Sequence, residues 1–215
     1  YRASHSAERR KLLKDFGLNI YRPKRPGSFW VRTTALGSYR EVGRACHLVT
    51  TNESRVMIDV GVNIASDTDP MPYFTAPEAL PMEKMDAVIL THAHLDHAGM
   101  LPVLFRYGYR GPVYCTPPTR DMMLLLQSDY LKVGGAEGKR APYDMEDIRT
   151  CMRHVVDVDW GQTVDIAPDM KLTFHNAGHI LGSSSVHLHV GDGKHNIVFS
   201  GDQKYEKSWL FDAAN

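Results

Sequence analysis

The sequence predicts a mixed α/β (α+β) fold in which two β-sheets pack face to face and helices cover the outside. Segments typical of β-strands occupy two blocks, residues 29–62 and 163–202, and the longest helical segments lie between them. Within each block the strand-like segments are joined by short turns. This spacing favours antiparallel pairing over a doubly wound parallel sheet.

The first 28 residues are expected to form a basic helix and a linker. Leu12, Leu13 and Phe16 are spaced as one side of a helix that begins near Ser6, and Gly17 supplies a stop signal. Residues 1–25 hold eight Lys or Arg against two acidic residues, a net charge of +6. A basic arm can follow a phosphate backbone, although a solvated linker helix has the same composition. Residues 29–215 then form the second unit.

The second unit opens with alternating or β-branched segments at residues 29–38, 44–51 and 54–62. A proline-rich loop at 66–84 leads to a strand at 86–90 and a helix at 97–108, whose Pro102 must lie in the first turn. A strand at 111–116 and helices at 119–133 and 143–155 follow, with a Gly-rich connector from Gly134 to Gly138 between the two helices. The last strands are expected within residues 163–167, 170–177, 183–193 and 195–202, with a hairpin at the Gly-Asp-Gly sequence 191–193.

Composition narrows the possible partners and compartment. The 215 residues carry no formal net charge, which by itself predicts no polyanionic partner. No apolar run reaches membrane-spanning length, and the N-terminus lacks the apolar core of a signal peptide, so no membrane partner is expected. Three widely separated cysteines do not suit a disulfide framework. They favour buried thiols and a cytoplasmic location.

The segment AVILTHAHLDHAGML, residues 87–101, runs from an apolar strand directly into His92, His94, Asp96 and His97. Imidazole nitrogens and carboxylate oxygens are the usual ligands of Zn²⁺. In an extended segment His92 and His94 point to the same side, whereas Asp96 and His97 turn into the next helix and point elsewhere. Four ligands spread over a turn suit two adjacent metal ions better than one. A metal-free loop is less favourable, because each imidazole would need its own hydrogen-bond partner.

Three residues elsewhere in the chain could complete the site. His179 follows one apolar strand, Asp202 ends another, and Asp59 ends a third, where it could hydrogen-bond a ligand imidazole. Taken singly, each has an equally simple interpretation as a turn or cap residue. His187 and His189 share one face of a strand, and a solvated sheet face accounts for both.

The motif THAHLDHAG matches the HxHxDH signature of the metallo-β-lactamase superfamily. Asp59, His179 and Asp202 fall, in order, where its first, third and fourth motifs lie. The segments TALGSYREVGRACHLV, GHILGSS and FSGDQKYEKSWLF resemble the β-CASP branch, which cuts nucleic acids. Within that branch the chain is most similar to the archaeal cleavage and polyadenylation specificity factors. Residues 1–28 resemble the segment that joins their KH domains to the catalytic domain.

This resemblance implies an αββα sandwich, of which the chain would hold the N-terminal part without the β-CASP insertion or the C-terminal strands. It implies two Zn²⁺ ions and places Asp59, Asp96 and Asp202 among the catalytic carboxylates. A further histidine ligand and the leaving-group acid would lie after residue 215. The implied ligands are His92, His94 and His179 for the first ion, Asp96 and His97 for the second, and Asp202 as the bridge.

The function implied is zinc-dependent RNA cleavage that leaves a 5′-phosphate and a 3′-hydroxyl, in RNA 3′-end processing and transcription termination. Endonucleolytic cleavage is expected, with 5′–3′ exonuclease activity as a second mode. Expected partners are single-stranded RNA, RNA polymerase and a second copy of the protein. A DNA-directed enzyme, a small-molecule thioesterase or lactonase, and a non-catalytic RNA-binding subunit remain as alternatives. The basic N-terminal segment favours RNA over a small molecule, and the complete ligand set disfavours the non-catalytic subunit.

Overall fold

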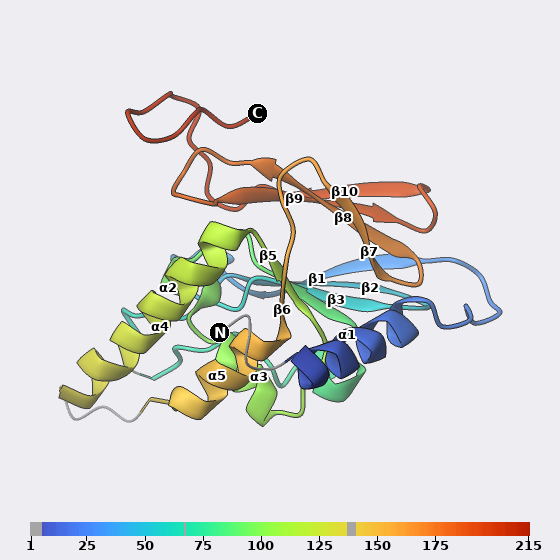
Figure 1. Ribbon diagram of the computed structural model, residues 1–215, viewed down its shortest axis with the longest axis horizontal. Coiled ribbons are helices and arrows are strands. Elements are labelled where there is room, and N and C mark those ends of the chain that lie inside the picture. The colour runs from blue at the N-terminus through green and yellow to red at the C-terminus, as the bar shows by residue number, and fades with distance from the viewer. Residues whose placement is uncertain (1–5, 67, 137–140) are drawn as a thin grey trace.

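A computed structural model describes residues 6–66, 68–136 and 141–215. Two β-sheets pack face to face, and helices cover the outer face of the first sheet (Figure 1). The first sheet has strand order β1-β2-β3-β4-β5-β6, and the second has strand order β10-β9-β8-β7. This is the mixed α/β architecture expected from the sequence. Residues 1–5, at the start of the predicted basic segment, and Gly138 of the predicted connector lie outside the described ranges.

The elements have the following bounds. The first sheet contains β1 (Val31–Gly37), β2 (Cys46–Thr51), β3 (Arg55–Ile58), β4 (Ala87–Ile89), β5 (Val113–Cys115) and β6 (Val155–Asp157). The second contains β7 (Thr163–Ala167), β8 (Met170–Asn176), β9 (Ser184–Val190) and β10 (His195–Phe199). The helices are α1 (Ser6–Ile20), α2 (Leu95–Ala98), α3 (Leu101–Arg106), α4 (Pro117–Ala136) and α5 (Met145–His154), with 3₁₀ turns η1 (Pro77–Ala79) and η2 (Met82–Lys84) in the proline-rich loop.

Three of the five strand pairs in the first sheet are parallel, contrary to the expectation of antiparallel pairing. The second sheet and the β1–β2 and β2–β3 pairs are antiparallel, but β3, β4, β5 and β6 are successive parallel neighbours. Parallel neighbours need long crossover connections. Here α2 and α3 connect β4 to β5, and α4 and α5 connect β5 to β6. The prediction gave too much weight to the hairpin-length turns near the two ends of the chain.

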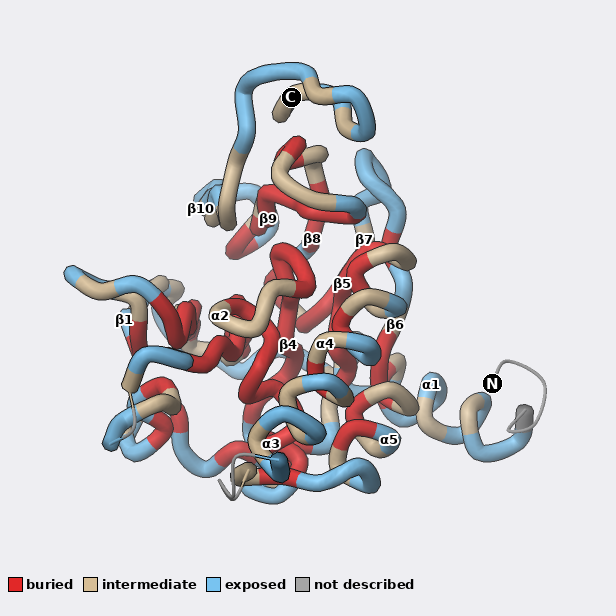
Figure 2. The backbone as a smooth tube through the Cα atoms, turned by 90° about the vertical axis from the view of Figure 1, so that its left-hand side faces the viewer, coloured by how far each residue is buried: buried red, intermediate tan, exposed pale blue. Residues whose placement is uncertain are grey.

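The strands of the first sheet are buried on both faces, which explains their continuous apolar sequences. In β3, Met57 faces the helices, while Val56 and Ile58 face the second sheet. Val88 and Ile89 of β4 divide between the same two layers. The buried segments, red in Figure 2, accordingly run through β4 and β5 and through the facing strands of the second sheet. Each fully buried side chain of this kind contributes about 1.5–3 kcal/mol.

Helix α1 continues past Gly17 to Ile20, so the predicted stop is wrong. Gly17 faces open space, and a solvated glycine costs a helix only about 1 kcal/mol relative to alanine. Phe16 is buried, with its ring 5.9 Å from that of His154. Leu13 is 42% exposed instead of lying on the buried side.

The basic helix is docked on the second unit and is not solvated all round. The Arg9 guanidinium donates to the backbone carbonyl oxygens of Arg153 and of Val155, the latter at 2.6 Å. These carbonyls lie where α5 passes into β6. Arg10 and Lys11 remain exposed.

Three boundaries in the helical block differ from expectation. The helix predicted at 97–108 is two helices, α2 and α3, and Pro102 lies in the first turn of α3 as required. Helix α4 extends through Gly134, so the Gly-rich connector does not begin there. Helix α5 begins after Asp144, whose carboxylate accepts from the amides of Glu146 and Asp147, and ends before β6, which the prediction missed.

The three cysteines are buried free thiols, as the sequence suggests. Among the residues with described positions, none of the helices combines the length and apolar character needed to cross a bilayer.

Candidate metal centre

The candidate site lies at one edge of both sheets. Asp59 follows β3 and His92 follows β4, and these parallel strands present their carboxyl ends at the same edge. In the second sheet, β8 and β10 are both antiparallel to β9 and therefore run in the same direction. His179 and Asp202, which follow these two strands, consequently meet at the edge that faces the first pair.

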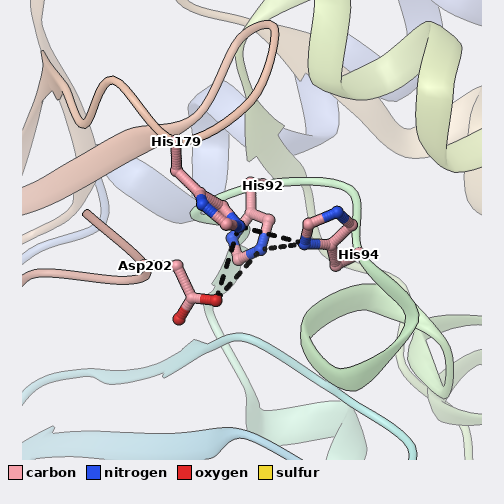
Figure 3. Close-up of side chains that lie close together, drawn as sticks. All are labelled: His92, His94, His179 and Asp202. Carbon is pink, nitrogen blue, oxygen red and sulfur yellow. Dashed lines mark hydrogen bonds and ion pairs between the residues drawn. The ribbon is translucent and has the colours of Figure 1, made fainter. Parts of the chain in front are cut away.

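Four of the predicted ligands bring their ligand atoms together, and all of these atoms lie within 4.8 Å of one another. His94 Nδ1 lies 3.1 Å from His92 Nε2 and 3.2 Å from His179 Nε2. Asp202 Oδ2 lies 3.5 Å from His179 Nε2 and 4.0 Å from His92 Nε2. Figure 3 shows the three rings and the carboxylate pointing toward a common point.

These separations fit a tetrahedral metal ion. Ligand atoms about 2.0–2.1 Å from Zn²⁺ lie roughly 3.3 Å apart at tetrahedral angles, and three of the six separations among the four atoms are 3.1, 3.2 and 3.5 Å. Hydrogen bonding alone explains the arrangement poorly, because a neutral imidazole has only one N–H to share. Three imidazole nitrogens and one carboxylate oxygen are a donor set suited to zinc.

His97 approaches Asp202 from the other side. Its Nδ1 lies 2.8 Å from Asp59 Oδ2, and its Nε2 lies 3.4 Å from Asp202 Oδ1 and 3.9 Å from Asp96 Oδ2. Asp202 therefore faces His179 with one carboxylate oxygen and His97 with the other. All six predicted ligands lie in this region. The assignment of Asp96 and His97 to a second ion stays a prediction.

Burial and neighbouring charge set the protonation of the rings. Burial, then repulsion from His97, lowers the pKa of His92 to about 3. Burial, then His179, lowers the pKa of His94. Both rings are therefore neutral near pH 7, the form that binds metal. Burial also acts to lower the pKa of His97, but the surrounding carboxylates, Asp59 foremost, outweigh it and raise this pKa to about 10.

Backbone contacts hold the segment that carries Asp96 and His97. Ala45 N donates to the Asp96 carbonyl oxygen at 2.8 Å, and Val60 N donates to that of His97 at 2.7 Å. Gly61 packs closely against the backbone of Asp96 and Ala45, and a Cβ there would lie 1.6 Å from the Asp96 carbonyl oxygen. The short helix α2 is thus fixed against the chain that follows β3.

The turn that carries His179 is fixed by a serine and a glycine. Ser183 Oγ accepts from the amides of His179 and Ile180 at 3.0 and 3.2 Å. Gly178 has φ +67°, and a Cβ there would lie 2.7 Å from Lys204 O. The turn therefore packs directly on the chain that follows Asp202.

The prediction from sequence missed Thr91. This residue is buried at the centre of the site, and its hydroxyl contacts both Asp59 and His92. The sequence held one signal for Thr91: it is the polar residue that ends the apolar run 87–90, directly before His92. His187 and His189 lie apart from the cluster on β9. There His187 Nε2 donates to Asn196 Oδ1 at 3.1 Å, and His189 Nε2 shares a hydrogen bond with Thr173 Oγ1 at 3.2 Å.

Comparisons with known proteins agree with this geometry. Residues 48–215 match the family model described as the metallo-beta-lactamase superfamily domain. The chain is 56% identical over 207 residues to the transcription termination factor FttA of Methanosarcina mazei and 51% identical over 215 residues to FttA of Methanocaldococcus jannaschii. These alignments cover 96% and 100% of this chain but 32% and 33% of the relatives. The chain thus spans about a third of their length.

Solved structures support the fold. A metallo-beta-lactamase from Cronobacter sakazakii superposes with a TM-score of 0.53 at 21% identity, over 82% of this chain and 64% of that one. A protein of unknown function from Enterococcus faecalis superposes with a TM-score of 0.56 at 16% identity, over 83% of this chain and 44% of that one. At these identities the likeness concerns the fold alone.

Proposed function

The chain belongs to the metallo-beta-lactamase superfamily, and we propose that it carries the metal site of a two-zinc nuclease that hydrolyses RNA phosphodiester bonds. The observation that carries the proposal is the convergence of His92, His94, His179 and Asp202 from separate segments, with the second oxygen of Asp202 turned toward His97. A carboxylate that faces two sets of ligands suits a bridge between two ions.

The proposed roles follow from the atoms that face one another. His92, His94 and His179 would hold the first ion, and Asp96 and His97 the second. Asp59, whose Oδ2 is 2.8 Å from His97 Nδ1, would keep a ring proton on that nitrogen, so that a bound ion would displace the proton of Nε2. Bound zinc would supply positive charge that polarises a phosphoryl group and lowers the pKa of water to about 7.

The carboxylates of the site also affect how a negatively charged substrate could bind. Asp59, Asp96 and Asp202 place three carboxylates at one edge, which would repel a phosphodiester while the ligand positions are empty. Metal occupancy is therefore needed for substrate binding as well as for hydrolysis. Scission of the P–O3′ bond would leave a 5′-phosphate and a 3′-hydroxyl. Endonucleolytic cleavage is proposed as the main mode, with 5′–3′ exonuclease activity as a second mode.

RNA is proposed as the substrate for two reasons. The relatives at 56% and 51% identity are transcription termination factors, and the exposed cations of α1, including Arg10, Lys11 and Lys14, can contact a phosphate backbone. We extend the proposal to a role in RNA 3′-end processing and transcription termination, with single-stranded RNA and RNA polymerase as partners. Residues 1–28 are proposed as a linker to RNA-binding domains, residues 29–215 as part of the catalytic domain, and a second copy of the protein as a further partner.

The decisive experiment compares His94→Ala with His187→Ala in the full-length protein. His94 supplies a ligand atom, whereas His187 is a strand histidine outside the cluster and serves as a matched control. With 5′-labelled single-stranded RNA, His94→Ala should reduce cleavage by more than about 100-fold, and His187→Ala should cleave as the wild type does. RNA cleavage by His94→Ala at the wild-type rate would refute the proposal.

Two substrate controls separate the alternatives. Single-stranded DNA of the same sequence tests a DNA-directed enzyme, and a thioester tests a small-molecule hydrolase of the same fold. If the protein turns over either of these compounds faster than RNA, that compound and not RNA is the substrate. Elemental analysis tests the non-catalytic alternative, because a purely RNA-binding subunit would contain no zinc.

A further inference from the structure

Thr91 lies where the ligand-bearing segments meet. It is 1% exposed. Its backbone amide donates to Asp59 Oδ1 at 2.8 Å, and its carbonyl oxygen accepts from Ser184 N at 2.8 Å. One residue is thereby bonded both to the end of β3 and to the start of β9, the strand that follows the His179 turn.

The Thr91 hydroxyl determines which nitrogen of His92 carries the proton. It lies 2.8 Å from Asp59 Oδ2 and 3.0 Å from His92 Nδ1. A carboxylate only accepts hydrogen bonds, so the single hydroxyl proton is donated to Asp59. The hydroxyl oxygen is then an acceptor toward His92, whose Nδ1 must hold the ring proton. The lone pair of His92 is left on Nε2, the atom that faces His94.

The rest of the Thr91 side chain packs on the segment that carries Asp202. Gly201, directly before Asp202, has φ +55°. A Cβ on Gly201 would lie 2.8 Å from Thr91 Cβ and 3.0 Å from its Oγ1. The threonine side chain therefore also sets the distance between the end of β4 and the Asp202 segment.

We propose that Thr91 is a positioning residue that fixes the Nδ1–H tautomer of His92 and the spacing of the Asp202 segment, so that the ligand atoms are arranged before metal binds. This inference rests on the metal-binding part of the proposed function and is independent of the RNA substrate.

The first test needs no variant. In metal-free wild-type protein, ¹⁵N NMR of the histidine rings near pH 7 should show His92 with a protonated Nδ1 and an unprotonated Nε2. A His92 ring protonated on Nε2, or a rapidly exchanging mixture of the two tautomers, would overturn the proposal.

The second test compares Thr91→Val with Thr91→Ser. Valine keeps the branched shape without the hydroxyl, whereas serine keeps the hydroxyl without the methyl group. Thr91→Val should bind zinc about 10–100-fold more weakly in a chelator competition and should lose the single His92 tautomer. Thr91→Ser should keep the tautomer and bind within a few-fold of the wild type.

Unchanged zinc affinity in Thr91→Val, or an equal loss in Thr91→Ser, would overturn the proposal. Circular dichroism of the metal-free variants establishes that each is folded. If Thr91→Val does not fold, the wild-type tautomer and the Thr91→Ser affinity still decide the question. A zinc effect in Thr91→Val without any RNA cleavage by the wild type would refute the proposed function and leave this inference intact.

Discussion

His97 Nδ1 lies 2.8 Å from Asp59 Oδ2, and both side chains are buried. Asp59 has φ +60°, a left-handed conformation that aspartate tolerates better than most residues. Its amide donates to Ile89 O, which ties the end of β3 to β4, while its carboxylate reaches the motif that follows β4. A single anion thus sets the orientation of His97 and, through Thr91, the proton of His92.

Replacing Asp59 should weaken metal binding without removing a direct ligand. In Asp59→Asn the amide can present an N–H to His97 Nδ1, which would favour the proton on Nε2 and block the atom that faces Asp202. We expect zinc affinity to fall about 10–100-fold in a chelator competition. Asp165→Asn, at a surface carboxylate paired with Lys171, is the control and should bind as the wild type does. Equal affinities of the two variants would contradict the role given to Asp59.

Removing His179 should lower the zinc content of the protein. His179 is the only ring among the four grouped ligands that comes from the second sheet, so its loss opens the site on that side. After dialysis, elemental analysis should find less zinc per chain in His179→Ala than in the wild type. His187→Ala removes a histidine from β9 outside the cluster and should leave the zinc content unchanged. Full occupancy in His179→Ala would place the metal elsewhere.

The candidate ligands could be predicted from the sequence because each follows a recognisable apolar strand or belongs to one dense motif. Their mutual distances could not, because they depend on how the end of β4 in the first sheet faces the ends of β8 and β10 in the second sheet, and no local pattern encodes this packing. Strand β6 was missed because three residues are too few to show alternation. The role of Thr91 was hidden because it depends on Asp59 and Gly201, which are remote in sequence and meet only in the fold.

Protonation of His154 should destabilise the protein below about pH 6.5. Burial lowers the pKa of this ring, which packs against Phe16 and Phe105. In the unfolded chain the pKa is about 6.5, so the unfolded state binds more protons between this value and the lower folded pKa. The free energy of unfolding should therefore decrease as pH falls through this window. Urea unfolding at several pH values should show a shallower decrease for His154→Gln, and parallel curves would exclude the effect.

Replacing Gly61 with alanine should displace the backbone that carries Asp96. A Cβ at this position would lie 1.6 Å from the Asp96 carbonyl oxygen. This oxygen belongs to the backbone, so it cannot move aside as the end of a flexible side chain could. Gly61→Ala should therefore lower the free energy of unfolding by about 1–3 kcal/mol, the usual cost of overpacking. Because the displaced carbonyl belongs to Asp96, zinc affinity should fall as well.

Gly17→Ala is the matched control for Gly61→Ala. Nothing lies within 4 Å of a Cβ at Gly17, and alanine favours the helical state of α1 by about 1 kcal/mol. The two variants should therefore shift the urea midpoint in opposite directions, with unchanged m-values, and only Gly61→Ala should alter zinc binding. A Gly61→Ala protein as stable as the wild type would show that the chain after β3 can separate from α2 at little cost. Asp96 and His97 would then not be held in place by this packing.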